Sequence, residues 1–168
     1  MPGSILGSKL ITLIASSRNL LCGDLASIFT TFPFLSIMNF EVVLESIEEL
    51  NEVNLPTIKS VELCAGLQLG GITPSYATTA YFCEHAVPEV HVMIRPRAGG
   101  FNYNEYEFKL MVEDIKFFAK LGVTGVVFGL LDENFKIEKE HTKRLYFAAK
   151  ELGLTRASLY RRLEKYGI

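Results

Sequence analysis

Two short apolar segments of this sequence carry reactive or polar side chains at every second position. These side chains are Glu62 and Cys64 in the first segment and His91, Met93 and Arg95 in the second. Successive side chains of a strand point to opposite faces, so each set shares one face. An ordinary core face would not collect such groups. The pattern therefore predicts a functional site on one inner surface built from both strands.

Copper binding is one candidate chemistry for this surface. Cu(I) prefers soft ligands, and Cys64 and Met93 offer a thiolate and a thioether. His91 adds an imidazole, so these three residues are the candidate metal ligands. Glu62 supplies a hard oxygen, which suits Cu(I) poorly. The competing interpretation is that Cys64 and Met93 simply fill the interior, which is the commonest role of both residue types.

An enzyme pocket for a small anionic substrate is the alternative. Arg95 and Arg97 flank a proline at the end of a predicted strand, where an arginine can hold a carboxylate or phosphate through paired hydrogen bonds. Glu62 is then the candidate catalytic acid or base. Against this reading, either arginine could form an internal ion pair with Glu62 or Glu41, because a buried charge needs a partner. Whether the chain is an enzyme stays open.

The elements that must position these residues follow a regular rhythm. Short apolar runs alternate with segments of helical periodicity at a spacing of about 30 residues, which is typical of parallel strands joined by helices. Strands are predicted near residues 40–44, 61–65, 90–95 and 125–130, and helices over 45–53, 75–84 and 104–121. Asn104 is a predicted helix cap, and Gly122 a predicted stop. The pattern predicts an α/β fold with its strands in sequential order.

The same segments resemble a known family. The strings FEVVLES, VELCAGLQLGGITPS, VHVMIRPRAGG and GVVFGLLDENFKIEKEHTKRL are similar, in this order, to segments of the CutC family, usually named copper homeostasis proteins. The resemblance covers residues 38–145. It implies a TIM-type (β/α) barrel, a cytoplasmic location and a role in copper handling. A complete barrel typically needs roughly 200–250 residues, so we expect a partial barrel of about four β/α units.

The last 21 residues have a different character. The string AAKELGLTRASLYRRLEKYGI resembles the C-terminal helix-turn-helix of Fis-type transcription regulators, with a helix ending near Leu152, a turn at Gly153 and a second helix capped by Thr155. This resemblance implies a short helical pair and a second alternative function, a DNA-binding regulator. In that reading the DNA contacts come from Arg156, Tyr160, Arg161, Arg162 and Lys165.

Composition and charge set the remaining expectations. The 168 residues carry a net charge of −2, but residues 141–168 hold 7 basic and 2 acidic side chains, a net of +5. The three cysteines form no CxxC pair, which favours a reducing cytosol. We expect three segments: an unassigned extension (1–37), a partial barrel (38–145) and a helix-turn-helix-like tail (146–168), from a truncated or chimeric gene product. Open strand edges predict self-association, and no membrane association is expected.

Overall fold

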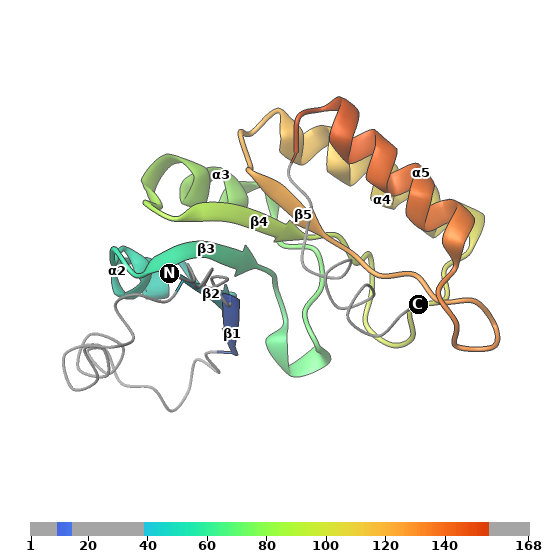
Figure 1. Ribbon diagram of the computed structural model, residues 1–168, viewed down its shortest axis with the longest axis horizontal. Helices are drawn as coiled ribbons and strands as arrows, with labels where there is room; N and C mark the ends of the chain where they lie inside the picture. Colours follow the sequence, from blue (N-terminus) through green and yellow to red (C-terminus); the bar gives the residue numbers. More distant parts are fainter. Residues whose placement is uncertain (1–9, 15–38, 155–168) are drawn as a thin grey trace, which may run out of the picture.

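A parallel β-sheet forms the centre of the molecule (Figure 1). The computed structural model describes residues 10–14 and 39–154. The strands are β1 (Leu10–Ile14), β2 (Asn39–Leu44), β3 (Ile58–Leu63), β4 (Glu89–Met93) and β5 (Gly125–Val127). Each strand pairs in parallel with the next one along the chain. This sequential order is that of a (β/α) barrel, since the order of a doubly wound sheet reverses at a switch point.

Among the described residues, helices connect the strands from β2 onward and follow the last one. They are η2 (Ile47–Glu49), α2 (Leu50–Val53), η3 (Leu67–Leu69), α3 (Tyr76–His85), α4 (Glu105–Ala119) and α5 (Lys139–Glu151). Figure 1 shows α3, α4 and α5 on one side of the sheet, with α5 lying along α4. The predicted α/β fold, a partial TIM-type barrel, is confirmed. Its four β/α units begin at β2, β3, β4 and β5.

Local sequence explains where the helices begin and end. The Ser75 side chain accepts a hydrogen bond from the backbone N–H of Thr78 and so caps α3. Asn104 caps α4 as predicted, and Glu107 returns a bond to the Asn104 backbone, which completes a capping box. Gly122 follows α4 with a φ of 85°, a conformation that glycine adopts without strain. The helix predicted over residues 45–53 is instead the short pair η2 and α2.

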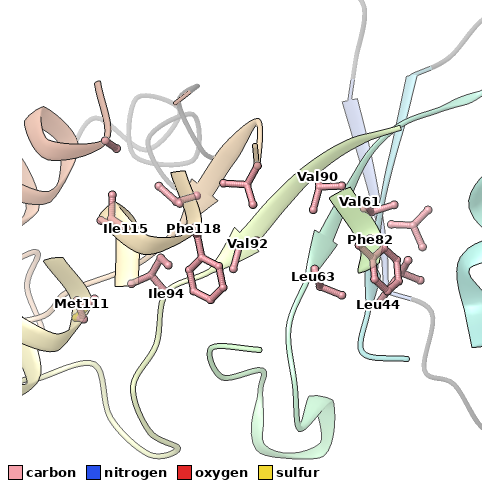
Figure 2. Close-up of a cluster of buried hydrophobic side chains, with 14 of the residues drawn as sticks. Leu44, Val61, Leu63, Phe82, Val90, Val92, Ile94, Met111, Ile115 and Phe118 are labelled. Carbon is pink, nitrogen blue, oxygen red and sulfur yellow. The ribbon is translucent and has the colours of Figure 1, made fainter. Parts of the chain in front are cut away.

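The hydrophobic core lies between the sheet and the helices. Val61 and Leu63 of β3 and Val92 of β4 are fully buried and point toward the helical side. Figure 2 shows Phe82 of α3 on the side of Leu63, and Phe118 of α4 on the side of Val92. The alternate positions of β3 and β4 therefore point away from the helices. That opposite face, the inner face, is the one that carries the predicted site.

Two features of the sheet differ from the sequence-based expectation. Residues 1–37 are expected to be an unassigned extension, yet β1, which lies within them, pairs with β2 in parallel register. The last strand ends at Val127, because the following residues leave the sheet: the backbone N–H of Leu131 donates to the carbonyl of Phe101, and that of Glu138 donates to Leu130. Residues 128–131 thus connect to the loop that follows β4.

The C-terminal part of the described residues contains a single helix, α5. Helix α5 spans the predicted segment boundary between residues 145 and 146, with Leu145 and Ala149 both buried. It ends close to the predicted position, and Gly153 follows with a φ of 76°. The second helix of the predicted pair lies outside the described residues. Among the described residues, no helix has the length and apolar character needed to cross a membrane.

Candidate functional site

The inner face of the sheet collects polar side chains that are nevertheless buried. The buried polar residues on it are Glu41 of β2, Ser60 and Glu62 of β3, and His91 of β4. Glu62 lies opposite His91 in the strand register. Cys64, which follows β3, is also buried, at 1% exposure. The alternation read from the sequence thus brings Glu62, Cys64, His91 and Met93 onto one face.

A hydrogen-bonded group centred on Glu41 crosses this face. Its Oε1 accepts from the Ser60 hydroxyl at 3.0 Å and lies 2.8 Å from Nδ1 of His91. An ionised carboxylate only accepts, so Nδ1 carries a proton. The other ring nitrogen, Nε2, is buried without a hydrogen bond, and Oε2 of Glu89 lies 3.6 Å from it. With the proton on Nδ1, Nε2 is the ring nitrogen that can accept a hydrogen bond or bind a cation.

Glu41 is a site residue that is not predicted from the sequence. The sequence suggests it only as a possible ion-pair partner of the arginines. The available signal was the alternation in FEVVL, which places Glu41 on the same face as Val43 and away from the core residues Val42 and Leu44. Its contact with His91 joins β2 to β4 across the intervening strand β3.

The two sulfur-bearing residues of the inner face both lie next to Gly71. A Cβ atom placed on Gly71 would lie 3.3 Å from Sγ of Cys64 and 3.5 Å from Cε of Met93. The thiol and the thioether methyl group thus lie on the same side of Gly71, and a side chain there would press on both. Burial raises the pKa of the Cys64 thiol to about 12, with the negative charge of Glu62 adding to the effect. The thiol is therefore protonated at neutral pH and donates weakly to the carbonyl of Leu44.

Arg95 lies just beyond β4 and is almost fully buried, at 5% exposure. Its Nη1 donates to the carbonyls of Leu69 and Gly71 at 3.1 and 2.7 Å, and its Nη2 donates to that of Gly99 at 2.6 Å. The guanidinium also stacks over the Phe101 ring at 4.6 Å. Its Nε makes no hydrogen bond. The terminal nitrogens of this arginine are thus bonded to backbone carbonyls from two loops.

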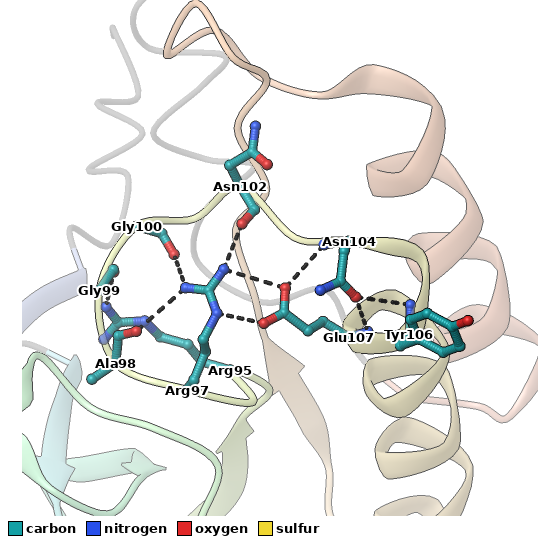
Figure 3. A network of polar contacts seen from close by, with 9 residues as sticks. All are labelled: Arg95, Arg97, Ala98, Gly99, Gly100, Asn102, Asn104, Tyr106 and Glu107. Carbon is teal, nitrogen blue, oxygen red and sulfur yellow. Dashed lines mark hydrogen bonds and ion pairs between the residues drawn. The ribbon is translucent and has the colours of Figure 1, made fainter.

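Arg97 lies closer to the surface and bonds to Glu107 of α4 (Figure 3). Its Nε donates to one carboxylate oxygen and its Nη2 to the other, the latter at 3.2 Å. The same guanidinium donates to the backbone carbonyls of Gly100 and Asn102. The hydrogen bond from Arg97 is the main reason that the pKa of Glu107 is lowered. Arg97 thereby ties the loop after β4 to the start of α4.

Neither arginine forms the internal ion pair considered from the sequence: the charged partner of Arg97 is Glu107, and Arg95 bonds to carbonyls. No group of three or more His, Cys, Asp and Glu side chains within residues 10–14 and 39–154 is arranged to hold a metal ion. A metal on the inner face would therefore depend on the thioether of Met93 as well as the thiol of Cys64. The predicted DNA-contacting residues Arg156, Tyr160, Arg161, Arg162 and Lys165 lie outside the described part of the chain.

Comparisons with known proteins match most of the described chain. The family model described as the CutC family matches residues 38–162. The family protein CutC of Mesorhizobium japonicum is 40% identical over 115 residues, covering 68% of this chain and 45% of the relative. A CutC family protein of Bacteroides fragilis is 42% identical over 117 residues, covering 69% of this chain and 47% of the relative. The chain thus spans about half the length of the curated relatives it matches.

A solved structure agrees with these sequence matches. The crystal structure of CutC from Streptococcus agalactiae, a protein named for copper homeostasis, superposes with a TM-score of 0.61 at 37% sequence identity. The superposition covers 68% of this chain and 55% of that one.

Proposed function

This chain belongs to the CutC family, and we propose from that premise that it handles copper, binding Cu(I) through Cys64 and Met93. The observation that carries the proposal is the convergence of both sulfur-bearing side chains beneath Gly71, where a single Cβ would touch them both. A thiolate and a thioether are the ligands that select Cu(I). Because Gly71 has no side chain, only its backbone lies over this pair.

The protonated thiol sets a condition on binding. A metal binds the thiolate, so Cu(I) must displace the proton of a thiol whose pKa is about 12. Copper affinity is therefore expected to increase with pH throughout the neutral range. The bound cation would also offset the negative charge of Glu62, which now opposes ionisation of the thiol.

His91 is the candidate third ligand. Its Nδ1 is held by Glu41, and such a carboxylate–histidine contact is the usual support of a metal-binding imidazole, because it orients the ring and leaves the other nitrogen free. Nε2 of His91 is buried and makes no hydrogen bond. His91 and Met93 share a face of β4, but the sulfur pair lies nearer the end of the strand.

A titration with Cu(I) against a competing chelator tests the proposal. The Cys64→Ser variant is expected to lose tight binding, and Met93→Leu to weaken it. Cys83→Ser is the matched control, because this cysteine packs on the opposite side of the sheet, against the hydrophobic core. Tight stoichiometric binding by Cys64→Ser would overturn the choice of ligands and leave the fold unaffected.

An anion-binding enzyme pocket is the second candidate. What favours it is that two buried polar atoms, Nε of Arg95 and the Tyr103 hydroxyl, lack a hydrogen bond of good geometry, although the two side chains interact with each other. In this reading Arg95 and Arg97 bind the anion and Glu62 is the acid or base. Calorimetric titration with inorganic phosphate would test it: saturable binding that Arg95→Lys abolishes and Cys64→Ser leaves intact supports this candidate over copper handling.

The remaining parts of the proposal concern location and association. A cytoplasmic location is supported by two free thiols, Cys64 and Cys83.

Self-association is supported by β5, which within the described residues has a neighbouring strand only on its β4 side. Light scattering at increasing concentration should show growing mass, and a constant monomer mass would contradict this. DNA binding through Arg156, Tyr160, Arg161, Arg162 and Lys165 stays an alternative, which a gel shift at physiological salt would test.

A further inference from the structure

The loop after β3 folds back over the end of its own strand. Residues 65 and 72 pair as an isolated antiparallel bridge, which closes the 66–72 loop. Gly66, Gly70 and Gly71 all have positive φ values, between 60° and 85°, so the loop makes turns that other residues rarely adopt. This fold places Gly71 against Cys64 and Met93. The 66–72 loop therefore covers the sulfur pair.

Arg95 holds this loop in its closed position. Two of its hydrogen bonds go to the far side of the loop, at the carbonyls of Leu69 and Gly71, and a third goes to Gly99 in the next loop. A Cβ on Gly70 would lie only 3.1 Å from Nη1, so the turn is pressed directly against the guanidinium. The backbone of Arg95 adds a bond to the Thr73 hydroxyl at 2.8 Å.

We propose that Arg95 is the positioning residue that sets access to the Cys64 thiol, by fastening the 66–72 loop over it. The carbonyl of Gly71 bonds to Arg95 at 2.7 Å, while a Cβ on the same residue would meet Sγ at 3.3 Å. One residue thus links the guanidinium to the sulfur. Copper entry to the proposed site then requires the loop to release Arg95.

The hydrogen bonds between Arg95 and the 66–72 loop are of a kind that can break and re-form. The guanidinium donates to the neutral carbonyls of Leu69, Gly71 and Gly99, so no ion pair has to be separated when the loop lifts. A planar fork with several fixed donors can bridge two loops at once, which the single ammonium group of lysine cannot reproduce. Arg97, two residues on, bonds to Glu107 and not to the 66–72 loop.

Thiol alkylation of the full chain tests this inference without copper. Iodoacetamide labelling of Cys64 is followed by peptide mass spectrometry, with the partly exposed Cys83 as an internal reference. Arg95→Ala should speed labelling of Cys64 by at least roughly ten- to hundredfold, because the loss of even one of its hydrogen bonds to the loop from a charged donor corresponds to such a factor. Cys83 should keep its rate. When methylguanidinium is added to the Arg95→Ala variant, the labelling of Cys64 should slow again, whereas methylammonium should have no such effect.

Two further variants keep the test decisive. Arg97→Ala is the matched control and should leave the Cys64 rate unchanged. Arg95→Lys retains the charge, and should raise the Cys64 rate by less than Arg95→Ala does. If both Arg95 variants speed Cys83 as much as Cys64, or if neither changes Cys64, the proposal is overturned, because Arg95 then serves general stability or has no effect on access.

Only the copper arm of this inference rests on the proposed function. If Cu(I) binds, Arg95→Ala should shorten the time of copper uptake in stopped-flow measurements, while Arg97→Ala should not. Faster alkylation without any copper binding would remove the proposed function and leave the role of Arg95 intact. Copper binding with alkylation and uptake rates that Arg95→Ala leaves unchanged would support the proposed function and overturn the role of Arg95.

Discussion

Glu41 and His91 contact each other from two strands that are not neighbours in the sheet. Oε1 of Glu41 lies 2.8 Å from Nδ1 of His91, and β3 runs between their strands. Both side chains are buried, with Glu41 at 1% exposure. A charged hydrogen bond in such surroundings is stronger than one in water, and its loss leaves a buried polar group unsatisfied. This contact therefore joins β2 to β4 across β3 on the inner face.

A double-mutant cycle measures that connection. The Glu41→Ala and His91→Ala variants, alone and combined, should give a coupling free energy of about 1.5–3 kcal/mol from urea unfolding, as expected for a hydrogen bond to a charged group. The matched control is the exposed pair Glu113 and Lys116 of α4, whose coupling should be about 0.3–0.5 kcal/mol. Equal coupling in the two cycles would contradict the structural role of the buried pair.

The cap of α4 should contribute measurably to stability. Asn104 accepts hydrogen bonds from the backbone N–H groups of Tyr106 and Glu107, so Asn104→Ala should lower the free energy of unfolding by about 0.5–2 kcal/mol. Asn102→Ala is the control, because Asn102 is exposed and bonds to Arg97 through its backbone carbonyl (Figure 3). A control variant as unstable as Asn104→Ala would show that the cap is not the cause.

Acid should weaken the protein partly through Glu107. The pKa of this carboxyl is lowered from 4.5, first by the Arg97 hydrogen bond and then by the Asn104 backbone. A lowered folded-state pKa gives stability that is present above 4.5 and is lost as the pH falls through the folded value. Glu107→Gln should therefore flatten the decline of the urea midpoint below that pH.

A second variant identifies the source of this pH effect. Arg97→Ala removes the main cause of the lowered pKa, so it should flatten the same part of the profile. The double variant should add little to either change, because both act on one hydrogen-bonded pair. Additive flattening, or no flattening with either variant, would show that the acid sensitivity arises elsewhere.

Much of the fold follows from side-chain alternation in the sequence. Val61 and Leu63 pack against the helices as their alternation predicts, and Glu62 and Cys64 take the other face. The periodicity of residues 104–121 also predicts α4 with its cap and stop. These features depend on neighbours along the chain, so local patterns suffice to predict them. The strand β1 depends instead on pairing with a distant segment of the chain, and it is not predicted from its local sequence.

The geometry of the site depends on contacts that local sequence does not encode. The bond between Glu41 and His91 spans 50 residues and is set by the register of three strands. The position of Arg95 depends on the conformation of two loops, and so does its choice of carbonyl acceptors over a carboxylate. Alternation therefore predicts which residues share the inner face. It does not predict their partners.

The central claim, that Cys64 and Met93 bind Cu(I), is tested most directly by X-ray absorption at the copper edge on the copper-loaded full chain. Sulfur scatterers are expected in the first shell, with one fewer in Met93→Leu and no tightly bound copper in Cys64→Ser. A first shell of nitrogen and oxygen alone, or a sulfur shell that persists unchanged in Cys64→Ser, would contradict the account.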